Sequence, residues 1–313
     1  MLRSLAEKSY EASEGKKDAL TAVNGLYDEL AKLDTQVDET PEYEFITDDL
    51  NLLLDSAVSK PGLRWRLPSL NTRLGSLRKG DFGFVFARPE SGKTTFLCSE
   101  VSAMAEQAKQ QGLGPVIHFN NEEQHDKVKL RYYQAVLGVT LAQLFSNKDK
   151  ADAMYKEKVG GHILLPNLTN FSNKQVEKIL AKFNPSLIVF DQIDKIQGFD
   201  ADRDDLRLGT IYQWARELAK QYGPVIGVTQ ADGTGEGQRW LTMGNVANAK
   251  TSKQAEADWI LGVGKSNDSG YERIRFFNIS KNKLMGDSDS DPRLRHDKWE
   301  ALIDPEHARY RDI

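Results

Sequence analysis

The chain has little cysteine: Cys98 is the only one among its 313 residues. A single thiol cannot close a disulfide within the chain or build a zinc site on several thiolates, so we expect a reducing, cytoplasmic setting. Long apolar runs are also missing, and residues 1–8 carry too much charge for a secretory signal. These absences argue against a disulfide-stapled secreted protein, a cysteine-rich zinc module and a membrane partner.

A strong excess of one charge is missing as well. The sequence has 42 Lys and Arg residues against 46 Asp and Glu residues, which gives a formal net charge of −4. Any contact with nucleic acid must therefore come from local basic loops rather than from the field of the whole protein. What the chain does have is length and apolar content. Its 313 residues, 39% of them hydrophobic, can bury a sizeable core, which predicts one large domain with an appendage.

The predicted appendage covers residues 1–45, and the main domain covers residues 46–313. Apolar residues recur at three- and four-residue spacing within residues 19–33, which predicts an amphipathic helix with one apolar stripe. The acidic, proline-containing residues 34–44 are typical of a linker. The stripe must be buried somewhere, and the pattern allows two answers, its own main domain or a neighbouring subunit. Its members are Leu20, Val23, Leu26, Tyr27, Leu30 and Leu33.

From residue 63 onward, short apolar runs alternate with helical patterns. This alternation predicts an α/β fold with a mainly parallel twisted sheet and helices on both faces. A proline-containing turn near the C-terminus predicts a terminal hairpin, and Gly- and Asp-rich segments predict mobile loops. The expected strands are 82–87, 116–120, 162–165, 187–190, 225–229, 259–263 and 274–279; helices are expected at 95–108 and around 206–222, the hairpin at 299–310, and the loops at 232–237 and 286–291.

One motif stands between an expected strand and an expected helix. Residues 87–94 fit the pattern [AG]-x-x-x-x-G-K-[ST], in which backbone N–H groups and a helix N-terminus face the phosphates of a nucleotide. Lys93 then adds a positive charge at the β- and γ-phosphates, and the Thr94 hydroxyl can hold Mg²⁺. We therefore predict a site for ATP and Mg²⁺ formed by Ala87, Arg88, Pro89, Glu90, Ser91, Gly92, Lys93, Thr94 and Thr95.

Polar residues at three other strand ends can complete this chemistry. Asp191 follows an apolar strand and can hold the Mg²⁺ shell, although many strands end in an acid that acts as a cap. Glu122 emerges at the carboxyl edge of the sheet and can activate the attacking water, but its neighbour Glu123 competes, and both suit the first turn of a helix. Gln230 can contact the γ-phosphate or remain a plain strand-end residue.

These motifs, in this order, resemble the RecA-type ATPase domain of the DnaB-like replicative hexameric helicases, the group that includes phage T7-type helicases and the mitochondrial helicase Twinkle. The likeness covers about residues 63–313 and implies a RecA-like P-loop NTPase fold. It also implies ATP hydrolysis at subunit interfaces, with Glu122 rather than Glu123 as the catalytic glutamate and Gln230 as the sensor. The segments that carry it are 67–81, 87–96, 119–122, 187–191, 228–230 and 255–261.

In the resembling family, a Lys-x-Arg pair on a late strand reaches into the nucleotide site of the neighbouring subunit. Lys281 matches the lysine, whereas Lys283 stands where the arginine is expected. Lysine keeps the charge but lacks the planar fork that grips two oxygens. The pair that reaches the neighbouring site, which we call the finger, then binds phosphate less firmly, or Arg293 or Arg295 takes the place of the arginine. Alternatively, Lys281 and Lys283 are two solvated lysines at a sheet edge with no such role.

The resemblance also implies DNA-binding loops after the sensor strand, where Arg239, Trp240, Lys250 and Lys253 could track phosphates or stack on a base. The same residues would also suit a plain surface loop. The implied function is 5′–3′ translocation of a homo-oligomeric, hexameric ring on single-stranded DNA, with unwinding of forked duplex and contacts to primase or other replisome proteins, as in a phage replisome inside its host cell. A RecA/RadA-type recombinase and a non-unwinding ATP-dependent clamp, loader or regulatory protein are the alternatives.

Overall fold

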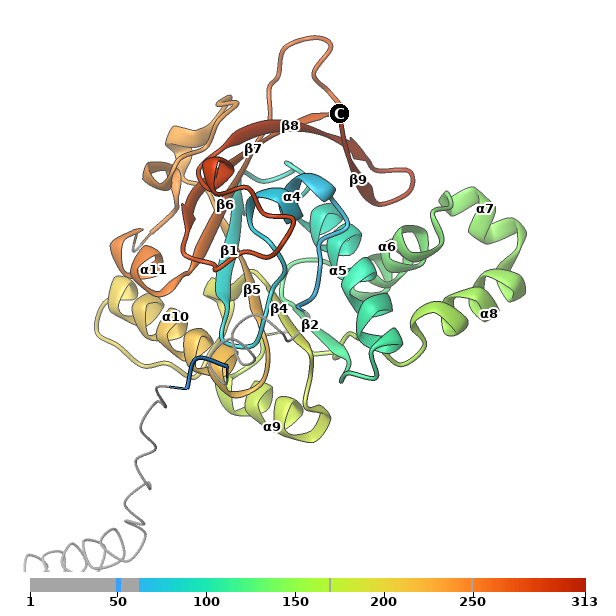
Figure 1. Cartoon of the computed structure of the whole chain (residues 1–313), viewed down its shortest axis with the longest axis horizontal. Coiled ribbons are helices and arrows are strands. Elements are labelled where there is room, and N and C mark those ends of the chain that lie inside the picture. Colours follow the sequence, from blue (N-terminus) through green and yellow to red (C-terminus); the bar gives the residue numbers. More distant parts are fainter. Residues whose placement is uncertain (1–48, 52–61, 169, 249) are drawn as a thin grey trace, which may run out of the picture. The chain divides into compact units, whose positions relative to one another are not determined.

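The structure is a computed structural model that describes residues 49–51, 62–168, 170–248 and 250–313. The chain divides into two units, Met1–Ala57 and Val58–Ile313. The helix expected at residues 19–33 and the linker expected at 34–44 lie outside the described residues, so these two expectations stay predictions. Among the helices that the structure describes, none combines the length and apolar character needed to cross a membrane. The second unit carries the fold discussed below (Figure 1).

Within the described part of this unit, nine strands form one sheet in the order β3-β2-β4-β5-β1-β6-β7-β8-β9. The pairings from β3 to β6 are parallel, and β6 to β9 continue the sheet with antiparallel pairings. The strands are β1 Phe82–Ala87, β2 Val116–Asn120, β3 Ile163–Leu164, β4 Leu187–Asp191, β5 Val225–Gln230, β6 Trp259–Gly264, β7 Ile274–Asn282, β8 Lys298–Asp304 and β9 Arg309–Asp312.

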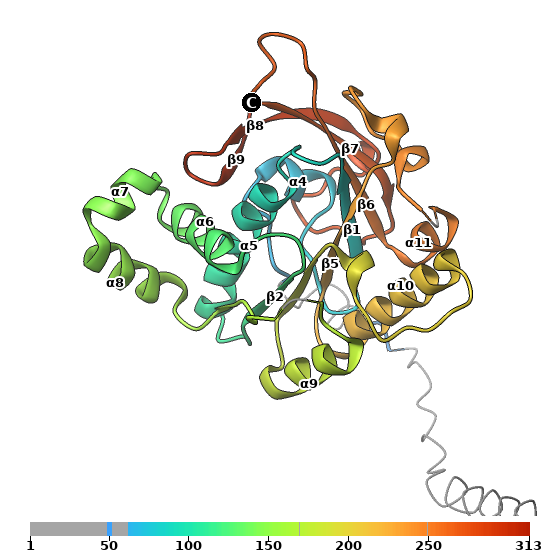
Figure 2. The ribbon, with the colours of Figure 1, turned by 180° about the vertical axis from the view of Figure 1, so that it is seen from behind.

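Helices cover both faces of this sheet (Figures 1 and 2). Successive residues of β1 face opposite layers. Val85 belongs to a core cluster with α5 (Lys93–Gln110) and α6 (His125–Leu137), whereas Phe84 and Phe86 belong to a second cluster with α9 (Asn173–Phe183) and α10 (Asp204–Gln221). A parallel strand buried on both faces reads as a continuous apolar run, as β1 does. The helices are α4 Pro68–Arg73, α5 Lys93–Gln110, α6 His125–Leu137, α7 Leu141–Ser146, α8 Lys148–Val159, α9 Asn173–Phe183, α10 Asp204–Gln221 and α11 Lys250–Glu256.

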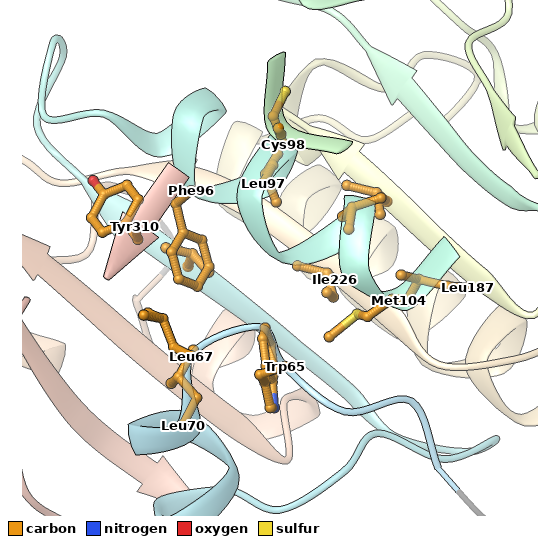
Figure 3. Packing of buried hydrophobic residues seen from close by; sticks show 14 of the residues in the cluster. Trp65, Leu67, Leu70, Phe96, Leu97, Cys98, Met104, Leu187, Ile226 and Tyr310 are labelled. Atoms are coloured by element: carbon orange, nitrogen blue, oxygen red, sulfur yellow. The ribbon is translucent and has the colours of Figure 1, made fainter. Parts of the chain in front are cut away.

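The first turn of α5 is fixed by aromatic packing. Phe96 lies 6.2 Å from Trp65 and 5.7 Å from Tyr310, measured between ring centroids, and the Tyr310 contact is edge-to-face. Figure 3 shows these side chains together with Leu67 and Leu70 from the segment that precedes β1. The start of α5 is therefore held between the lead-in segment and the last strand, both far from it in sequence.

The expected fold class is confirmed, and each expected strand has a counterpart. The strands expected at 82–87 and 116–120 coincide with β1 and β2, and the terminal hairpin is β8 and β9. The helix expected at 95–108 is α5, and the one expected around 206–222 is α10. The loop expected at 232–237 contains a short 3-10 helix, Gly233–Gly235, and α11 occupies part of the stretch for which only loops were predicted.

Candidate active site

Four strand ends bring the predicted site residues to one edge of the sheet. Ala87, the last residue of β1, pairs with Gln230 at the end of β5, and Asn120 at the end of β2 pairs with Asp191 at the end of β4. Because these strands are parallel, all four carboxyl ends meet at the same edge, where ligands bind in open α/β sheets. Residues 87–94, which we call the phosphate loop, therefore lie at the same edge as Glu122, Asp191 and Gln230.

The phosphate loop turns sharply from β1 into α5. Gly92 has a φ of +92°, and a Cβ at this position would lie 2.5 Å from Ile303 Cδ1 and 2.7 Å from Tyr310 Oη. Only glycine fits this combination of backbone angle and close neighbours. Lys93 folds back over the loop, with Nζ 3.1 Å from the Arg88 carbonyl oxygen and 3.4 Å from that of Ala87. The ammonium group is thus held where a phosphate oxygen could replace the two carbonyls.

Thr94 and Asp191 form an oxygen-rich pair next to this lysine. Thr94 Oγ1 donates to Asp191 Oδ2 at 3.1 Å, whereas Asp191 Oδ1 is buried and has no hydrogen-bond partner among the described residues. Burial, and then the nearby Glu122 charge, raise the pKa of Asp191 to about 7. An orphaned carboxylate oxygen beside a hydroxyl is a donor set that suits Mg²⁺. These residues therefore fit the predicted metal.

The two adjacent glutamates have different surroundings. Glu123 forms an ion pair with Arg131 of α6, at 2.7 Å, which directs its carboxylate toward that helix. Glu122 instead accepts a hydrogen bond from Gln192 Nε2 at 2.9 Å. Burial lowers the pKa of Lys93, and the Glu122 carboxylate opposes part of this shift. The same carboxylate contributes to the raised pKa of Asp191. Glu122 is thus the member of the pair that faces the phosphate loop.

Two residues near the phosphate loop, Gln192 and Arg275, were not predicted from the sequence. Gln192 is buried with a φ of +64°, a strained conformation for a residue with a side chain, and it orients Glu122. Arg275 of β7 is buried and donates from Nε to the Ser91 carbonyl oxygen in the phosphate loop at 2.8 Å. No motif marks either residue. The position of Gln192 directly after Asp191 is the single signal that could have singled it out.

Gln230 and Arg88 connect the phosphate loop to the segment that follows β5. Gln230 is half-buried, and its carbonyl oxygen accepts from the Ala247 N–H at 3.0 Å. Arg88 forms an ion pair with Glu236 at 2.9 Å and also donates to the Ala231 carbonyl oxygen at 3.0 Å. The predicted loop at 232–237 is therefore bound directly to the phosphate loop. The sensor role of Gln230 stays a prediction.

The two candidate finger lysines lie away from the phosphate loop of their own chain. Lys281 pairs with Ile260, which pairs with Phe84, and the Lys283 N–H donates to the Asp258 carbonyl oxygen just before β6. Both lysines thus lie toward the amino end of β1, opposite the loop. Lys281 Nζ donates to the Gln254 carbonyl oxygen and, at 3.4 Å, to that of Ala255, the last turn of α11.

The other finger candidates are arginines with partners of their own. Arg295 donates to the carbonyl oxygens of Asn282, at 3.0 Å, and Leu284, at 2.7 Å, so its guanidinium holds the end of β7. Arg293 is exposed and forms an ion pair with Asp291 at 2.7 Å. A role for either in the site of another subunit would require these contacts to break.

Of the residues predicted to contact DNA, Lys253 is buried, whereas Arg239 and Trp240 are half-buried. The Lys253 side chain is fully buried and ion-paired, so it has no surface that could track a phosphate backbone. Arg239 pairs with Asp268 at 2.6 Å and lies 4.4 Å from the Tyr271 ring centre. Trp240 packs edge-to-face on Phe276. Lys250 begins α11, but its side chain lies outside the description.

Comparisons with known proteins agree with this fold. A family model described as an AAA domain matches residues 49–231. One solved structure, described as an ATPase domain, shares 15% identity at a TM-score of 0.68, covering 86% of this chain and 100% of that one. A second solved structure, described as "The Structure Of A DnaB-Like Replicative Helicase And Its Interactions With Primase", shares 13% sequence identity at a TM-score of 0.65, covering 99% of this chain and 76% of that one. No curated protein matches. The expected resemblance to DnaB-like helicases is confirmed in the fold.

Proposed function

The chain belongs to the AAA domain family, and from this membership we propose that it is an ATP hydrolase that acts as a DnaB-like replicative DNA helicase. It assembles into a homo-oligomeric ring, expected to be a hexamer, moves 5′–3′ on single-stranded DNA and separates forked duplex. The observation that carries the proposal is the cluster at the carboxyl edge of the sheet. There, Lys93, Thr94 and Asp191 meet beside Glu122, a glutamate that forms no ion pair with the residues described in the structure.

The phosphate loop binds the triphosphate through its N–H groups, the α5 N-terminus and Lys93. Lys93 exchanges the carbonyl oxygens of Ala87 and Arg88 for phosphate oxygens, which it prefers because they are fully charged. Arg275 keeps the loop in shape through the Ser91 carbonyl oxygen. These residues bind and orient the substrate; none of them changes its covalent state.

Thr94 and Asp191 would hold Mg²⁺, which polarises phosphate oxygens when bound. The hydrogen bond between their side chains already places both oxygens on the same side of the loop. With a pKa of about 7, Asp191 is partly protonated near neutral pH, and it has to be ionised to bind a cation. Asp191 Oδ1, which has no hydrogen-bond partner among the described residues, would be available to the cation.

Glu122 acts as the general base that takes a proton from the attacking water. The Gln192 amide holds its carboxylate in place, and the Arg131 pair keeps Glu123 away from the reaction. Gln230, next to the phosphate loop in the sheet, senses the γ-phosphate. Lys281 and Lys283 serve the site of the neighbouring subunit, because they lie toward the opposite edge of the sheet from their own phosphate loop.

The simplest test measures ATP turnover with and without single-stranded DNA. Lys93→Ala should abolish turnover, whereas Lys174→Ala, at an exposed position on α9, should leave it unchanged. Single-stranded DNA should stimulate the wild type, and forked duplex should be unwound only when ATP is present. Size measurement with a non-hydrolysable nucleotide should show a ring. Full turnover by a strictly monomeric form would contradict the proposal.

The candidate DNA loop favours a second function, a nucleotide-dependent regulator or loader that does not unwind DNA. Lys253 is buried and Arg239 is neutralised by Asp268, which leaves few free cations in the part of this loop that the structure describes. The two functions differ in their response to salt, because phosphate contacts release counterions and make DNA binding strongly salt-dependent. DNA-independent turnover combined with ATP-dependent capture of a replisome protein such as primase would support this second function.

A further inference from the structure

Lys253 is buried although it carries a charge, and it sits between segments that belong to the nucleotide site. Its ammonium group donates to Asp194 Oδ2 at 2.6 Å, to Thr229 Oγ1 at 3.2 Å and to the Ala247 carbonyl oxygen at 2.9 Å. The Tyr212 ring lies 5.4 Å from the same nitrogen. All three donor positions of the ammonium are therefore used, which is what a buried lysine requires.

The acceptors of Lys253 are neighbours of proposed site residues. Asp194 lies in the 3-10 helix Ile193–Lys195, which begins two residues after Asp191, and Thr229 directly precedes Gln230. Thr229 Oγ1 donates to Asp194 Oδ2 at 2.7 Å, and Tyr212 Oη donates to Asp194 Oδ1 at 3.2 Å. One cation thus joins the segment behind the proposed metal ligand to the strand that carries the proposed sensor.

Lys253 lies in the middle of α11, and the residues that follow it in this short helix bind Lys281, the proposed finger. Lys281 Nζ donates to the carbonyl oxygens of Gln254 and Ala255, the two residues that follow Lys253 in α11. A shift of α11 therefore changes what Lys281 can contact. Since Gln254 and Ala255 are one and two residues after Lys253, about 1.5–3 Å of helix rise, a displacement of Lys253 displaces these carbonyl oxygens with it.

We propose that Lys253 is a positioning residue that makes the placement of Lys281 depend on the nucleotide bound by its own subunit. The inference rests on the proposed function, because it takes Lys281 to serve the neighbouring site. When the ends of β4 and β5 respond to the γ-phosphate, Asp194 and Thr229 move with them, and Lys253 transmits that movement to α11. Lys281 is then released toward the neighbour or retained on the carbonyl oxygens of α11.

A mixing experiment separates this role from a local one. Lys253→Met keeps the size of the side chain but removes the cation. We expect about a tenfold loss of kcat, in the range of coupling between two sites, with nucleotide affinity and ring size unchanged. Rings are then formed with an excess of Glu122→Gln chains, which still bind ATP but lack the proposed general base, and which keep an intact Lys253 and Lys281. Turnover per Lys253→Met chain should rise severalfold, because these sites now receive a working finger.

Lys281→Ala is the positive control and should show the same rise. If Lys281→Ala is rescued by mixing and Lys253→Met is not, the lysine acts only on its own site and the proposal is overturned. If neither is rescued, delivery of Lys281 between subunits is overturned as well, while the loss of turnover in Lys93→Ala would still uphold ATP hydrolysis. Should Lys253→Met unfold, Asp194→Asn weakens the same ion pair from the other side and has to give the same pattern.

Discussion

Glu122 and Glu123 are adjacent in sequence but differ in what their carboxylates contact. Arg131 neutralises Glu123, whereas Glu122 accepts only from the neutral Gln192 amide among the contacts found in the described residues. The Asn120 side chain fixes both backbone N–H groups, each at 3.2 Å, so the two side chains diverge from a rigid turn. A general base needs a free lone pair near the reacting water, and this geometry assigns that property to Glu122.

Glu122→Gln should lower kcat for ATP hydrolysis by about 10²- to 10⁴-fold, the range expected when a general base is removed. The glutamine keeps the shape of the side chain, so binding of a fluorescent ATP analogue should change little. Glu123→Gln is the matched control and should retain most of the activity, because it weakens only a half-exposed ion pair. Equal losses in the two variants would contradict the assignment.

A third carboxylate, Glu100, is buried in α5 away from the proposed chemistry. It accepts from the Leu67 N–H at 3.0 Å and from Ser99 Oγ at 2.9 Å. Burial raises the pKa of Glu100 from its ordinary value of 4.5 to about 7, and Arg66 opposes part of this effect. The carboxyl group thus joins the segment before β1 to the helix after the phosphate loop, at the cost of tolerating a buried charge at high pH.

The pH dependence of stability follows from that shift. A pKa raised on folding gives a stabilisation that is complete below the unfolded value and is lost as the pH rises through about 7. Between pH 5 and pH 8, Glu100 should therefore remove about 2–3 kcal/mol from the free energy of unfolding. Glu100→Gln should flatten this part of the profile in urea titrations. An unchanged slope would mean that the Glu100 carboxylate is better solvated than its burial implies.

Some of these residues could be read from the sequence, and others could not. The positions of Lys93 and Asp191 were predictable because the Gly-Lys-Thr pattern follows one buried strand and an apolar run marks the other. Gln192 was not, because its importance comes from a left-handed backbone and a contact with Glu122 that only the fold brings together. The burial of Lys253 was not predictable either, since a basic residue in a polar segment looks the same whether it faces solvent or a half-buried Asp194.

The strands β1 and β6 pack so closely that there is no room for a side chain at position 83 of β1. A Cβ on Gly83 would lie 2.2 Å from the indole ring of Trp259, its partner across the strand pair. The Trp259 ring is fully buried and packs edge-to-face on Trp65, 5.4 Å away. It cannot move without disturbing the core that also supports the start of α5.

Gly83→Ala should therefore lower the free energy of unfolding by about 1–3 kcal/mol, the cost of overpacking a well-filled core. Gly233→Ala is the matched control, because a Cβ there would meet no atom within 4 Å. Its effect should stay within about 0.5 kcal/mol, as for most surface substitutions. Chemical denaturation monitored by tryptophan fluorescence measures both variants. Equal stability would show that the Trp259 ring can shift at little cost.

Helices and strands of this chain differ in how well their hydrophobic patterns predict them. The strands β1, β2 and β4 are contiguous apolar runs because both of their faces are buried, so their positions were predictable to within one residue. The helix α11 was missed because the side chain that it buries is Lys253, which leaves no apolar stripe to detect. Hydrophobic periodicity therefore does not detect a short helix whose buried side chain is a cation.

The arrangement of the larger unit makes a single copy incomplete for the proposed reaction. The strands β7, β8 and β9 extend the sheet and support the phosphate loop through Arg275 and Tyr310, whose hydroxyl lies 3.3 Å from the Gly92 carbonyl oxygen. The same extension places Lys281 toward the opposite edge of the sheet. If Lys281 is the finger, as we propose, the cation that joins Lys93 at the phosphoryl group comes from another copy, and hydrolysis should depend on assembly.

The amphipathic stripe predicted at residues 19–33 is the candidate for driving that assembly. If it docks on a neighbouring subunit, replacing Leu26 and Leu30 together by Ala should shift the protein to smaller species in sedimentation with a non-hydrolysable nucleotide, and turnover should fall in parallel. Higher protein concentration should restore both, because association follows mass action. Lys32→Ala, on the opposite face of the predicted helix, is the control and should do neither. If the double variant keeps its size but melts at a lower temperature, the stripe packs on its own chain instead, and assembly must rest on the ATPase unit alone.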